Sequence, residues 1–567
     1  MIYHVHIRRK LLFIFGGIFM FCILNLICKI KQSKDRQFSL ENLLAKETLK
    51  LNKLKVRNTK LDTSIISSPC NDKNKPSVNY EANRRILRSS LDAFWYSIKT
   101  KLDAVIENKA TDLQSISKKL IISGSKGHNT LLATLDRITE ADGFQKWREK
   151  EYRGLSLLVQ KRLSSLQNPK SCSSTQKLIC NLSIDCGFGC QLHHVVYCLI
   201  VAYGTNRMLL LDTENWNYGK GAFQKMFEPL SKTCNLPKKY SFQKISNRFP
   251  RKKDGFFQRQ KGIESNINWW PGEKNDEFVR LPRMRDMKEK PEFLPPSIPK
   301  DIFKRILRLH GDPIVWLIGQ FLKYILRPTK STKKYLKSAK QSSSEYGHQV
   351  GIHIRRTDKL EKEANFYSVE QYMESVEEYF QYYDIRYGNH SNLKQIYIAS
   401  DDPEVFLECR KNYPQYKFLG DVSRARSAAT SSRYNNNSLQ KLFLDVYMLS
   451  LSDFIVCTFS SNLCRIAYEI QQQRSSGDNH WRFKSLDDMW QFNIKWDTVV
   501  EHYQEVILPH FSNRPGEMSL KVGDILNIES NLWDGYGKGK SVNNRKSGLY
   551  PLYKTKEKLK AVDFTFN

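Results

Sequence analysis

The chain has 567 residues, of which 91 are lysine or arginine and 58 are aspartate or glutamate, so its formal net charge is +33. This length excludes a single small domain, and a hydrophobic content of 40% excludes wholesale disorder. The positive charge is compatible with a nucleic acid, a membrane surface or a nucleotide as the partner, and the charge alone does not distinguish these three classes.

A membrane anchor is expected near the N-terminus. Residues 1–10 end in three basic side chains and are expected to form a cytoplasmic tail. Residues 11–28 follow without a charge and are mostly apolar, near the lower length limit for one membrane-spanning helix. No small-residue cleavage site follows them, which favours an uncleaved signal anchor over a signal peptide.

The cysteines indicate an oxidising compartment. Six of them crowd between Cys172 and Cys234, and two more lie near position 460. A zinc site built from Cys186, Cys190 and the adjacent histidines is the competing interpretation, but no second CxxC pair completes a tetrahedral set. Disulfides are therefore favoured, although spacing alone does not choose their pairing. They place the body of the chain on the lumenal side of a single-pass type II protein.

Residues 29–170 are expected to form a helical stem. Apolar side chains recur there at spacings of three and four from Leu87 to Leu120, as in one long amphipathic helix with a coiled-coil seam. A second helical pattern runs from Trp147 to Leu166. Such a stem either packs on its own catalytic body or joins two chains, and we expect a homodimer.

An α/β pattern begins after the stem. Residues 171–345 are expected to form a first α/β lobe, with a buried helix over 191–203 and a strand over 208–211. Residues 346–504 alternate strands with helices, which is typical of a Rossmann-type, doubly wound parallel sheet. The strands are expected at 350–354, 396–399, 416–419 and 454–457, and the helices at 369–383, 403–412, 439–450 and 462–473.

Ligands of such sheets bind at the carboxyl ends of the strands, so the residues that follow each strand are the candidates. Arg355 and Arg356 follow the first strand, and a guanidinium fork suits the oxygens of a diphosphate. Asp401 and Asp402 follow the second strand. Ser461 follows the last, where hydroxyls and helix N-terminal amides would cradle a second anion. Together they predict a nucleotide-diphosphate site.

No metal is expected at this site. Many nucleotide-sugar transferases hold a divalent ion with an Asp-x-Asp motif, and no such triplet occurs in the chain. Asp401 and Asp402 are adjacent rather than alternate. The two arginines would then neutralise the leaving diphosphate.

Longer stretches carry a family resemblance. Residues 351–359 read Gly-Ile-His-Ile-Arg-Arg-Thr-Asp-Lys, and residues 457–461 read Cys-Thr-Phe-Ser-Ser. With residues 186–198 and 202–205, they closely resemble the alpha-1,6-fucosyltransferases that core-fucosylate N-glycans. The resemblance implies a GT-B-like Golgi enzyme that transfers fucose from GDP-β-L-fucose to O6 of the asparagine-linked GlcNAc, with inversion and without metal.

The resemblance also implies which residues bind the donor. Arg355 and Arg356 match the arginines that hold the diphosphate. His353 and Asp445 match the groups that recognise guanine. The other donor-site positions, two of which lie where backbone amides approach the donor, are Gly187, Cys190 and Tyr372.

The implied catalytic residues follow strands of the second lobe. Glu363 is expected to be the base that deprotonates O6, with Lys359 relaying or orienting the proton. The other positions that match residues whose loss disables the family are Arg355, Asp358, Asp401, Asp402 and Ser461.

Disulfides and a C-terminal module follow from the same resemblance. Residues 505–567 are expected to form a Src-homology-3-like β-barrel that helps to hold the N-glycan acceptor. At Leu532 the family has a histidine, so any acceptor contact of that imidazole has no counterpart here.

The resemblance also implies four disulfide pairs: Cys172–Cys234, Cys180–Cys198, Cys186–Cys190 and Cys457–Cys464.

Two alternatives remain. A catalytically inactive glycan-binding protein could share the scaffold, but the joint retention of Arg355, Lys359, Glu363 and Asp445 argues against decay. A nucleic-acid-binding protein is suggested only by the net charge. That charge lies mostly in the stem and in the segment that precedes the second lobe, whereas the second lobe is net negative. No nucleic-acid partner is therefore expected.

Overall fold

The structure is a computed structural model, whose compact unit from Asn74 to Asn567 contains all the described residues. The preceding residues, with the expected tail and signal anchor, lie outside the described part. Within that part, no helix has the length and apolar character needed to cross a membrane. The described residues are 75–107, 111–182, 184, 186–235, 267–269, 277–281, 291–341, 348–359, 365–388, 394–428, 432–474, 479–491, 502–512, 514–532 and 534–564.

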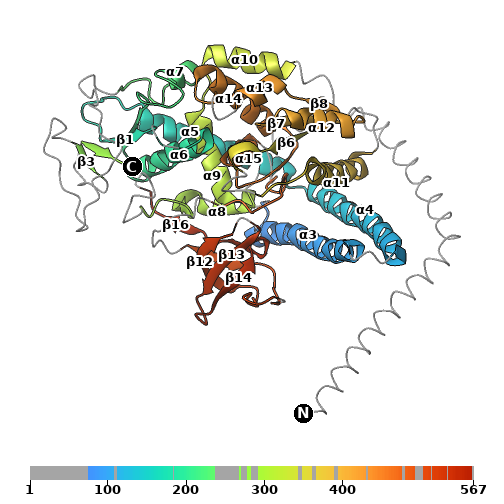
Figure 1. Ribbon diagram of the computed structural model, residues 1–567. Helices are drawn as coiled ribbons and strands as arrows, with labels where there is room; N and C mark the ends of the chain where they lie inside the picture. Colours follow the sequence, from blue (N-terminus) through green and yellow to red (C-terminus); the bar gives the residue numbers. More distant parts are fainter. Residues whose placement is uncertain are drawn as a thin grey trace, which may run out of the picture. The chain divides into compact units, whose positions relative to one another are not determined.

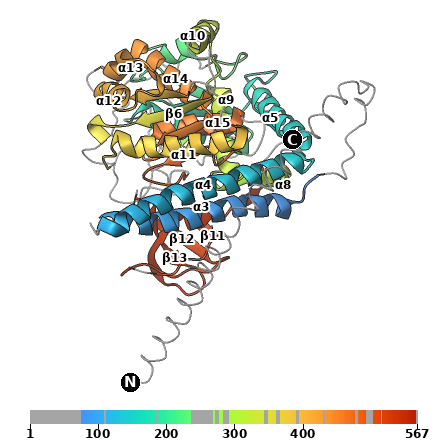
Figure 2. The ribbon, with the colours of Figure 1, turned by 90° about the vertical axis from the view of Figure 1, so that its right-hand side faces the viewer.

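Three helices occupy the described part of the stem: α3 (Val78–Glu107), α4 (Thr111–Ala141) and α5 (Gln145–Gln167). The expectation of one long helix through Leu120 is wrong, because the chain reverses between α3 and α4, which lie side by side (Figure 2). The spacing of apolar residues describes each helix separately and does not show where the chain turns. α4 packs against α11 and α3 against α8, so this stem lies on its own catalytic region.

Close packing and a buried ion cluster fix the α3–α4 hairpin. A Cβ atom added to Gly124 of α4 would lie 2.2 Å from the ring of Trp95 of α3, so the two helices approach closely there. Glu81 of α3 is fully buried and accepts a hydrogen bond of 2.9 Å from Arg148 Nε of α5. Arg148 also bonds to Asp142, in the turn between α4 and α5. This cluster ties all three helices together.

The first lobe contains a four-stranded parallel sheet in the order β2-β1-β4-β3. The predicted helix and strand correspond to α6 (Phe188–Gly204) and β2 (Met208–Asp212), whereas the other four strands of this lobe were not predicted. The almost entirely buried α6 supplies much of the lobe's core. The other elements are β1 (Lys177–Asn181), α7 (Ala222–Met226), β3 (Ile267–Trp269), β4 (Phe278–Arg280), β5 (Ser297–Pro299), α8 (Lys300–Leu309), α9 (Pro313–Ile325) and α10 (Lys330–Gln341).

The second lobe contains a five-stranded, fully parallel sheet in the order β10-β9-β6-β7-β8. This confirms the predicted parallel α/β architecture, and β10 is an additional strand. Figure 1 labels β6, β7 and β8 of this sheet. The strands are β6 (Gln349–Ile354), β7 (Gln395–Ser400), β8 (Lys417–Leu419), β9 (Phe454–Cys457) and β10 (Phe483–Ser485). The helices are α11 (Val369–Tyr387), α12 (Glu404–Asn412), α13 (Val422–Ser427), α14 (Asn436–Leu451) and α15 (Asn462–Arg474).

Side chains of the central strands alternate between two layers of helices. Ile352 and Ile398 belong to the core that α11 and α12 complete. Tyr397 and Ala399 face the other way, into the core that α14 and α15 complete. This alternation is why the strands are buried on both faces and appear in the sequence as nearly continuous apolar runs.

A C-terminal domain follows as a five-stranded antiparallel sheet in the order β14-β13-β12-β11-β15. Its first strand begins at Tyr503, two residues before the predicted boundary, and its small core includes Val506, Leu526 and Tyr550. The chain then returns to the first lobe, where β16 (Lys560–Val562) pairs with β5. The strands are β11 (Tyr503–Val506), β12 (Ile525–Asn531), β13 (Tyr536–Ser541), β14 (Ser547–Pro551) and β15 (Thr555–Glu557).

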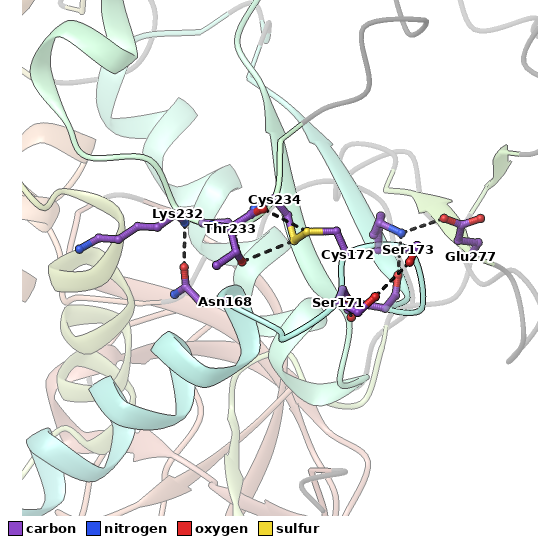
Figure 3. Close-up of a disulfide and its surroundings, with 11 residues drawn as sticks. Asn168, Ser171, Cys172, Ser173, Lys232, Thr233, Cys234 and Glu277 are labelled. Atoms are coloured by element: carbon purple, nitrogen blue, oxygen red, sulfur yellow. Dashed lines mark hydrogen bonds and ion pairs between the residues drawn. A yellow bond between two sulfur atoms is a disulfide. The ribbon is translucent and has the colours of Figure 1, made fainter.

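Disulfides lie in both lobes, and they are the four pairs that the family resemblance implies. Figure 3 shows the Cys172–Cys234 disulfide, which lies just after the stem. Close to it, Asn168 Oδ1 accepts a hydrogen bond of 2.7 Å from the Lys232 amide. The four are Cys172–Cys234, Cys180–Cys198, Cys186–Cys190 and Cys457–Cys464.

Candidate active site

The candidate site lies where three parallel strands of the second lobe end. The register pairs Ile354 of β6 with Ser400 of β7, and Ile352 of β6 with Val456 of β9. The residues that follow these strands therefore meet at one edge of the sheet, as the sequence predicts.

Asp401 joins two of these strand ends. Its carboxylate pairs with the guanidinium of Arg355 and accepts a hydrogen bond of 2.8 Å from the backbone amide of Arg356. It also accepts a hydrogen bond from the hydroxyl of Thr357. Thr357 has a φ of 45°, a left-handed conformation that is uncommon for a residue other than glycine and that clusters at functional sites. Asp401 therefore fixes the direction of the chain that carries both arginines.

Asp358 lies between two guanidinium groups. Its carboxylate is 2.6 Å from Arg355 Nη2 and 3.0 Å from Arg433 Nη2. Burial alone would raise the pKa of Asp358, but the hydrogen bond and charge of Arg433, with the charge of Arg355, lower it to about 2. Asp358 is therefore ionised at neutral pH and orients both arginines.

Arg433 was not predicted from the sequence. It precedes α14 and follows no strand, so the rule that located Arg355 does not apply to it. Its neighbour Tyr434 makes an edge contact with Tyr218 of the first lobe, with 5.5 Å between ring centroids. Arg433 therefore lies where the two lobes face each other, and it adds a third guanidinium to the predicted pair.

Arg356 points toward a second pair of carboxylates. Its guanidinium lies 3.3 Å from Asp402 and 3.4 Å from Glu408 of α12. Its Nε atom is buried and, among the described residues, has no hydrogen-bond partner. The Phe366 ring covers the guanidinium at 4.9 Å. The Nε–H group of Arg356 can therefore donate a hydrogen bond to an oxygen atom of a bound ligand.

His353 and Asp445 both lie on the side of the sheet that α14 covers. Burial lowers the pKa of His353 to about 4, so the imidazole is neutral at pH 7. Asp445 accepts hydrogen bonds of 2.7 Å from the Tyr397 hydroxyl and 2.8 Å from Arg424 Nε. Burial raises the pKa of Asp445 to about 6, although Arg424 and Tyr397 oppose this shift. A neutral imidazole and a buried carboxylate can recognise the polar edge of a base.

The first lobe reaches the same region through the N-terminus of α6. Gly187 is the N-cap residue of this helix, and Cys190 lies in its first turn. A Cβ atom added to Gly189 would be 2.7 Å from the backbone of Asn462, at the start of α15. Because Ser461 directly precedes Asn462, the structure brings Gly187, Cys190 and Ser461 to the point where the lobes meet.

The second anion cradle expected beside Ser461 differs in the structure. The amides of Phe459 and Ser460 donate hydrogen bonds of 2.7 and 3.1 Å to the carboxylate of Asp487. A carboxylate of the chain itself therefore binds these two amides, which precede α15. Tyr372 of α11 is buried nearby, and burial raises its pKa, opposed by a hydrogen bond with Thr458. Tyr372 thus supports the turn after β9.

Two expected catalytic positions cannot be placed with the others. Glu363 lies outside the described residues, and Lys359 ends a short 3-10 helix whose backbone alone is described there. The cysteines of the alternative zinc interpretation, Cys186 and Cys190, are bonded to each other. The described site is therefore a set of arginines balanced by carboxylates.

Comparisons with known proteins agree on one family. The profile of the alpha-(1,6)-fucosyltransferase N- and catalytic domains matches residues 23–256 and 258–491. The alpha-(1,6)-fucosyltransferase of Drosophila melanogaster is 38% identical over 86% of this chain and 74% of its own length. That of Caenorhabditis elegans is 33% identical over 84% of this chain and 78% of its own length.

A solved structure is also similar. NodZ alpha-1,6-fucosyltransferase, soaked with GDP-fucose, is 12% identical, with a TM-score of 0.31 over 52% of this chain and 93% of that chain. NodZ is a fucosyltransferase from Bradyrhizobium. The profile match and the two curated relatives carry the assignment, since each covers most of the chain. The chain belongs to the alpha-(1,6)-fucosyltransferase family and is a fucosyltransferase enzyme.

Proposed function

We propose that this fucosyltransferase takes fucose from GDP-β-L-fucose and transfers it in alpha-1,6 linkage to the asparagine-linked GlcNAc of N-glycans. The observation that carries the donor assignment is the group of Arg355, Arg356 and Arg433, whose guanidinium groups pair with carboxylates of Asp401, Asp402 and Asp358. Guanidinium groups held in fixed directions suit a diphosphate. The acceptor assignment rests on the family.

The proposed reaction is a single inverting displacement. Glu363 takes the proton from O6 of the acceptor, and Lys359 orients or relays that proton. The new bond joins O6 to the anomeric carbon while the bond from that carbon to the diphosphate oxygen breaks. GDP leaves with the electron pair, and Arg355 and Arg356 stabilise the charge that develops on it.

Mass spectrometry of one reaction tests the proposal. The soluble lumenal portion is incubated with GDP-fucose and a biantennary N-glycan ending in GlcNAc, and the position of the added fucose is determined. Arg355→Ala should abolish transfer and weaken GDP binding, whereas Glu363→Gln should abolish transfer and leave GDP affinity unchanged by calorimetry. Absence of transfer by the wild type, or transfer to another position, contradicts the proposal.

We expect no metal requirement. The arginines and their orienting carboxylates are the charged groups of the described site, and they would neutralise the leaving diphosphate themselves. Turnover should therefore continue in excess EDTA. A loss of turnover that manganese restores contradicts this proposal.

The second candidate is an inactive glycan-binding protein on the same scaffold. The two functions differ in one readout, because an inactive protein would bind the N-glycan without consuming GDP-fucose. The C-terminal domain is proposed to be the Src-homology-3-like module that contributes to acceptor binding, with Leu532, 44% exposed, in place of the family's histidine. Leu532→His should therefore change which antennae are preferred and leave GDP affinity unchanged.

We also propose a Golgi membrane protein of type II topology that forms homodimers through the stem. The dimer is supported by apolar side chains of the predicted seam that face solvent: Phe94 is 69% exposed and Leu120 is 52% exposed. In sedimentation experiments, Phe94→Asp with Leu120→Asp should yield monomers. Leu157→Asp is the control, since Leu157 is 70% exposed but lies on α5, outside this seam. A wild type that is monomeric contradicts the proposal.

A further inference from the structure

A polar cavity lies at the edge of the second lobe's sheet opposite the candidate active site. Its volume is about 210 Å³, and it lies among the stem helices, α11 and the turns that lead into the strands. His348, Asp453 and Arg482 each directly precede a strand, namely β6, β9 and β10. Arg355 and Asp401 follow their strands, so the cavity and the candidate active site lie at opposite ends of the sheet.

Aromatic rings form one wall of this cavity. The ring centroids of His348 and Tyr383 are 4.0 Å apart, and those of Tyr383 and Tyr387 are 4.7 Å apart. Trp481 adds an indole ring from the turn before β10 and contacts Tyr382 at 5.6 Å. The negative face of an aromatic ring attracts polarised C–H groups, so this wall suits the C–H face of a flat, hydroxylated ring.

Most charges around the cavity already have partners. Arg386 lies 2.7 Å from Asp136 and 2.6 Å from Glu140. Arg148 is paired with the buried Glu81. The cavity therefore lacks the cluster of uncompensated cations that would attract a free phosphate or carboxylate.

Arg482 and Asp453 provide two further polar groups of the lining. Arg482 Nε is buried and has no hydrogen-bond partner among the described residues. Asp453 accepts hydrogen bonds from His348 Nδ1 at 3.0 Å and from the Gln349 amide at 3.1 Å. No ion pair in the described part of the chain joins Arg482 to Asp453. A ligand with several hydroxyl groups can accept a hydrogen bond from one side chain and donate a hydrogen bond to the other.

We propose that this cavity is a binding subsite for one neutral monosaccharide unit. Its volume is below the range of about 300–1,000 Å³ that is typical for larger ligands, so it suits one sugar ring rather than an oligosaccharide. Hydroxyl groups would accept hydrogen bonds from Arg482 and donate hydrogen bonds to Asp453, while the sugar ring covers the tyrosine rings of the wall. This inference concerns binding alone and does not depend on the donor or acceptor of the proposed reaction.

Saturation-transfer NMR on the soluble lumenal portion tests the subsite, with methyl glycosides of N-acetylglucosamine, mannose, galactose and fucose as probes. Saturating GDP is present and the acceptor is absent, and Arg355→Ala is measured in parallel, so binding at the active site is recognised separately. At least one glycoside should bind equally to the wild type and to Arg355→Ala. Arg482→Gln should weaken that binding about tenfold, since a hydrogen bond from a charged group contributes about that factor.

Two further variants keep the result interpretable. Tyr387→Ala should also weaken binding, and it should be tolerated because Tyr387 is 45% exposed. Arg410→Gln, at an exposed position of α12, is the matched control and should leave binding unchanged. Absence of binding by every glycoside, binding that Arg482→Gln and Tyr387→Ala leave unchanged, or binding of phosphate or acetate in place of the sugars overturns the proposal.

Discussion

Asp401, at the end of β7, forms an ion pair with Arg355, at the end of β6, so two neighbouring strands each contribute one partner. Only about 4% of the Asp401 side chain is exposed, which removes most of the competition from water. The pair fixes the direction in which Arg355 can point before any ligand arrives. Such preorganisation lowers the free-energy cost of binding an anion.

Asp401→Asn should lower kcat/KM for the donor by about 10- to 100-fold, because a hydrogen bond between charged groups contributes about 1.5–3 kcal/mol. Initial-rate kinetics at varied GDP-fucose concentration measure this change. Asp384→Asn is the matched control, since Asp384 pairs with Lys394 away from the site. Equal effects of the two substitutions would contradict the orienting role of Asp401.

The pKa of Asp445, raised by burial to about 6, predicts a pH dependence of donor binding. If guanine donates hydrogen bonds to this carboxylate, a proton on Asp445 competes with the base. The GDP dissociation constant should then rise about tenfold as the pH falls from about 7 to about 5. His353 does not titrate in this window, because its pKa is about 4.

Calorimetry at several pH values measures that dependence, and Asp445→Asn supplies the control. The diphosphate of GDP also titrates, and the variant retains that contribution while losing the contribution of the carboxyl group. The wild type should therefore show a steeper loss of affinity below about pH 6 than the variant. Parallel pH profiles for the two proteins would exclude Asp445 as the titrating group.

Alanine substitutions at two glycines of α4 should have opposite effects on the stability of the stem. Gly124→Ala places a methyl group against Trp95 and should destabilise the hairpin by about 1–3 kcal/mol. Gly127→Ala meets nothing within 4 Å and should stabilise the helix by up to about 1 kcal/mol. Hydrogen exchange of the α3 and α4 amides in the full chain reports both. Stabilisation by Gly124→Ala would contradict the close approach of these helices.

Removing one partner of the buried ion pair between Arg148 and Glu81 should strongly lower the stability of the fold. Arg148→Met should cost about 3 kcal/mol or more of unfolding free energy, since it leaves a buried carboxylate with fewer partners. The double substitution with Glu81→Met should cost less than Arg148→Met alone.

Urea unfolding of the single and double variants measures these differences. Arg153→Met, on the same helix, serves as the control because the Arg153 side chain is 72% exposed and its pair with Glu149 spans 4.0 Å. A surface pair of this kind contributes about 0–1 kcal/mol. A double variant less stable than Arg148→Met would show that the apolar replacements do not pack.

The strand-end residues could be predicted because their position depends on local pattern alone. A buried apolar run marks β6, and the polar residues directly after it must lie at the edge of the sheet, which locates Arg355. Arg433 and Glu408 could not be found in this way. They reach the site from a turn and from a helix, and their approach depends on tertiary packing that no local spacing records.

The stem shows the same limit of local pattern. Helical periodicity identified the apolar positions on α3 and α4 but did not reveal the reversal between them. The three-residue strands β4 and β10 were also missed, whereas the equally short β8 was predicted because it lies between two helical patterns of the alternating region. The disulfide pairs came from the family resemblance, since spacing leaves many connectivities open.

The pairing of β16 with β5 gives the C-terminal domain attachments to both lobes. Asn531 of β12 donates a hydrogen bond to Asp488, which follows β10 of the second lobe. Beyond the domain, β16 pairs with β5 and Phe564 packs on Tyr203 of the first lobe. The C-terminal segment therefore connects the two lobes. A change in the angle between the lobes must distort or break one of these two contacts.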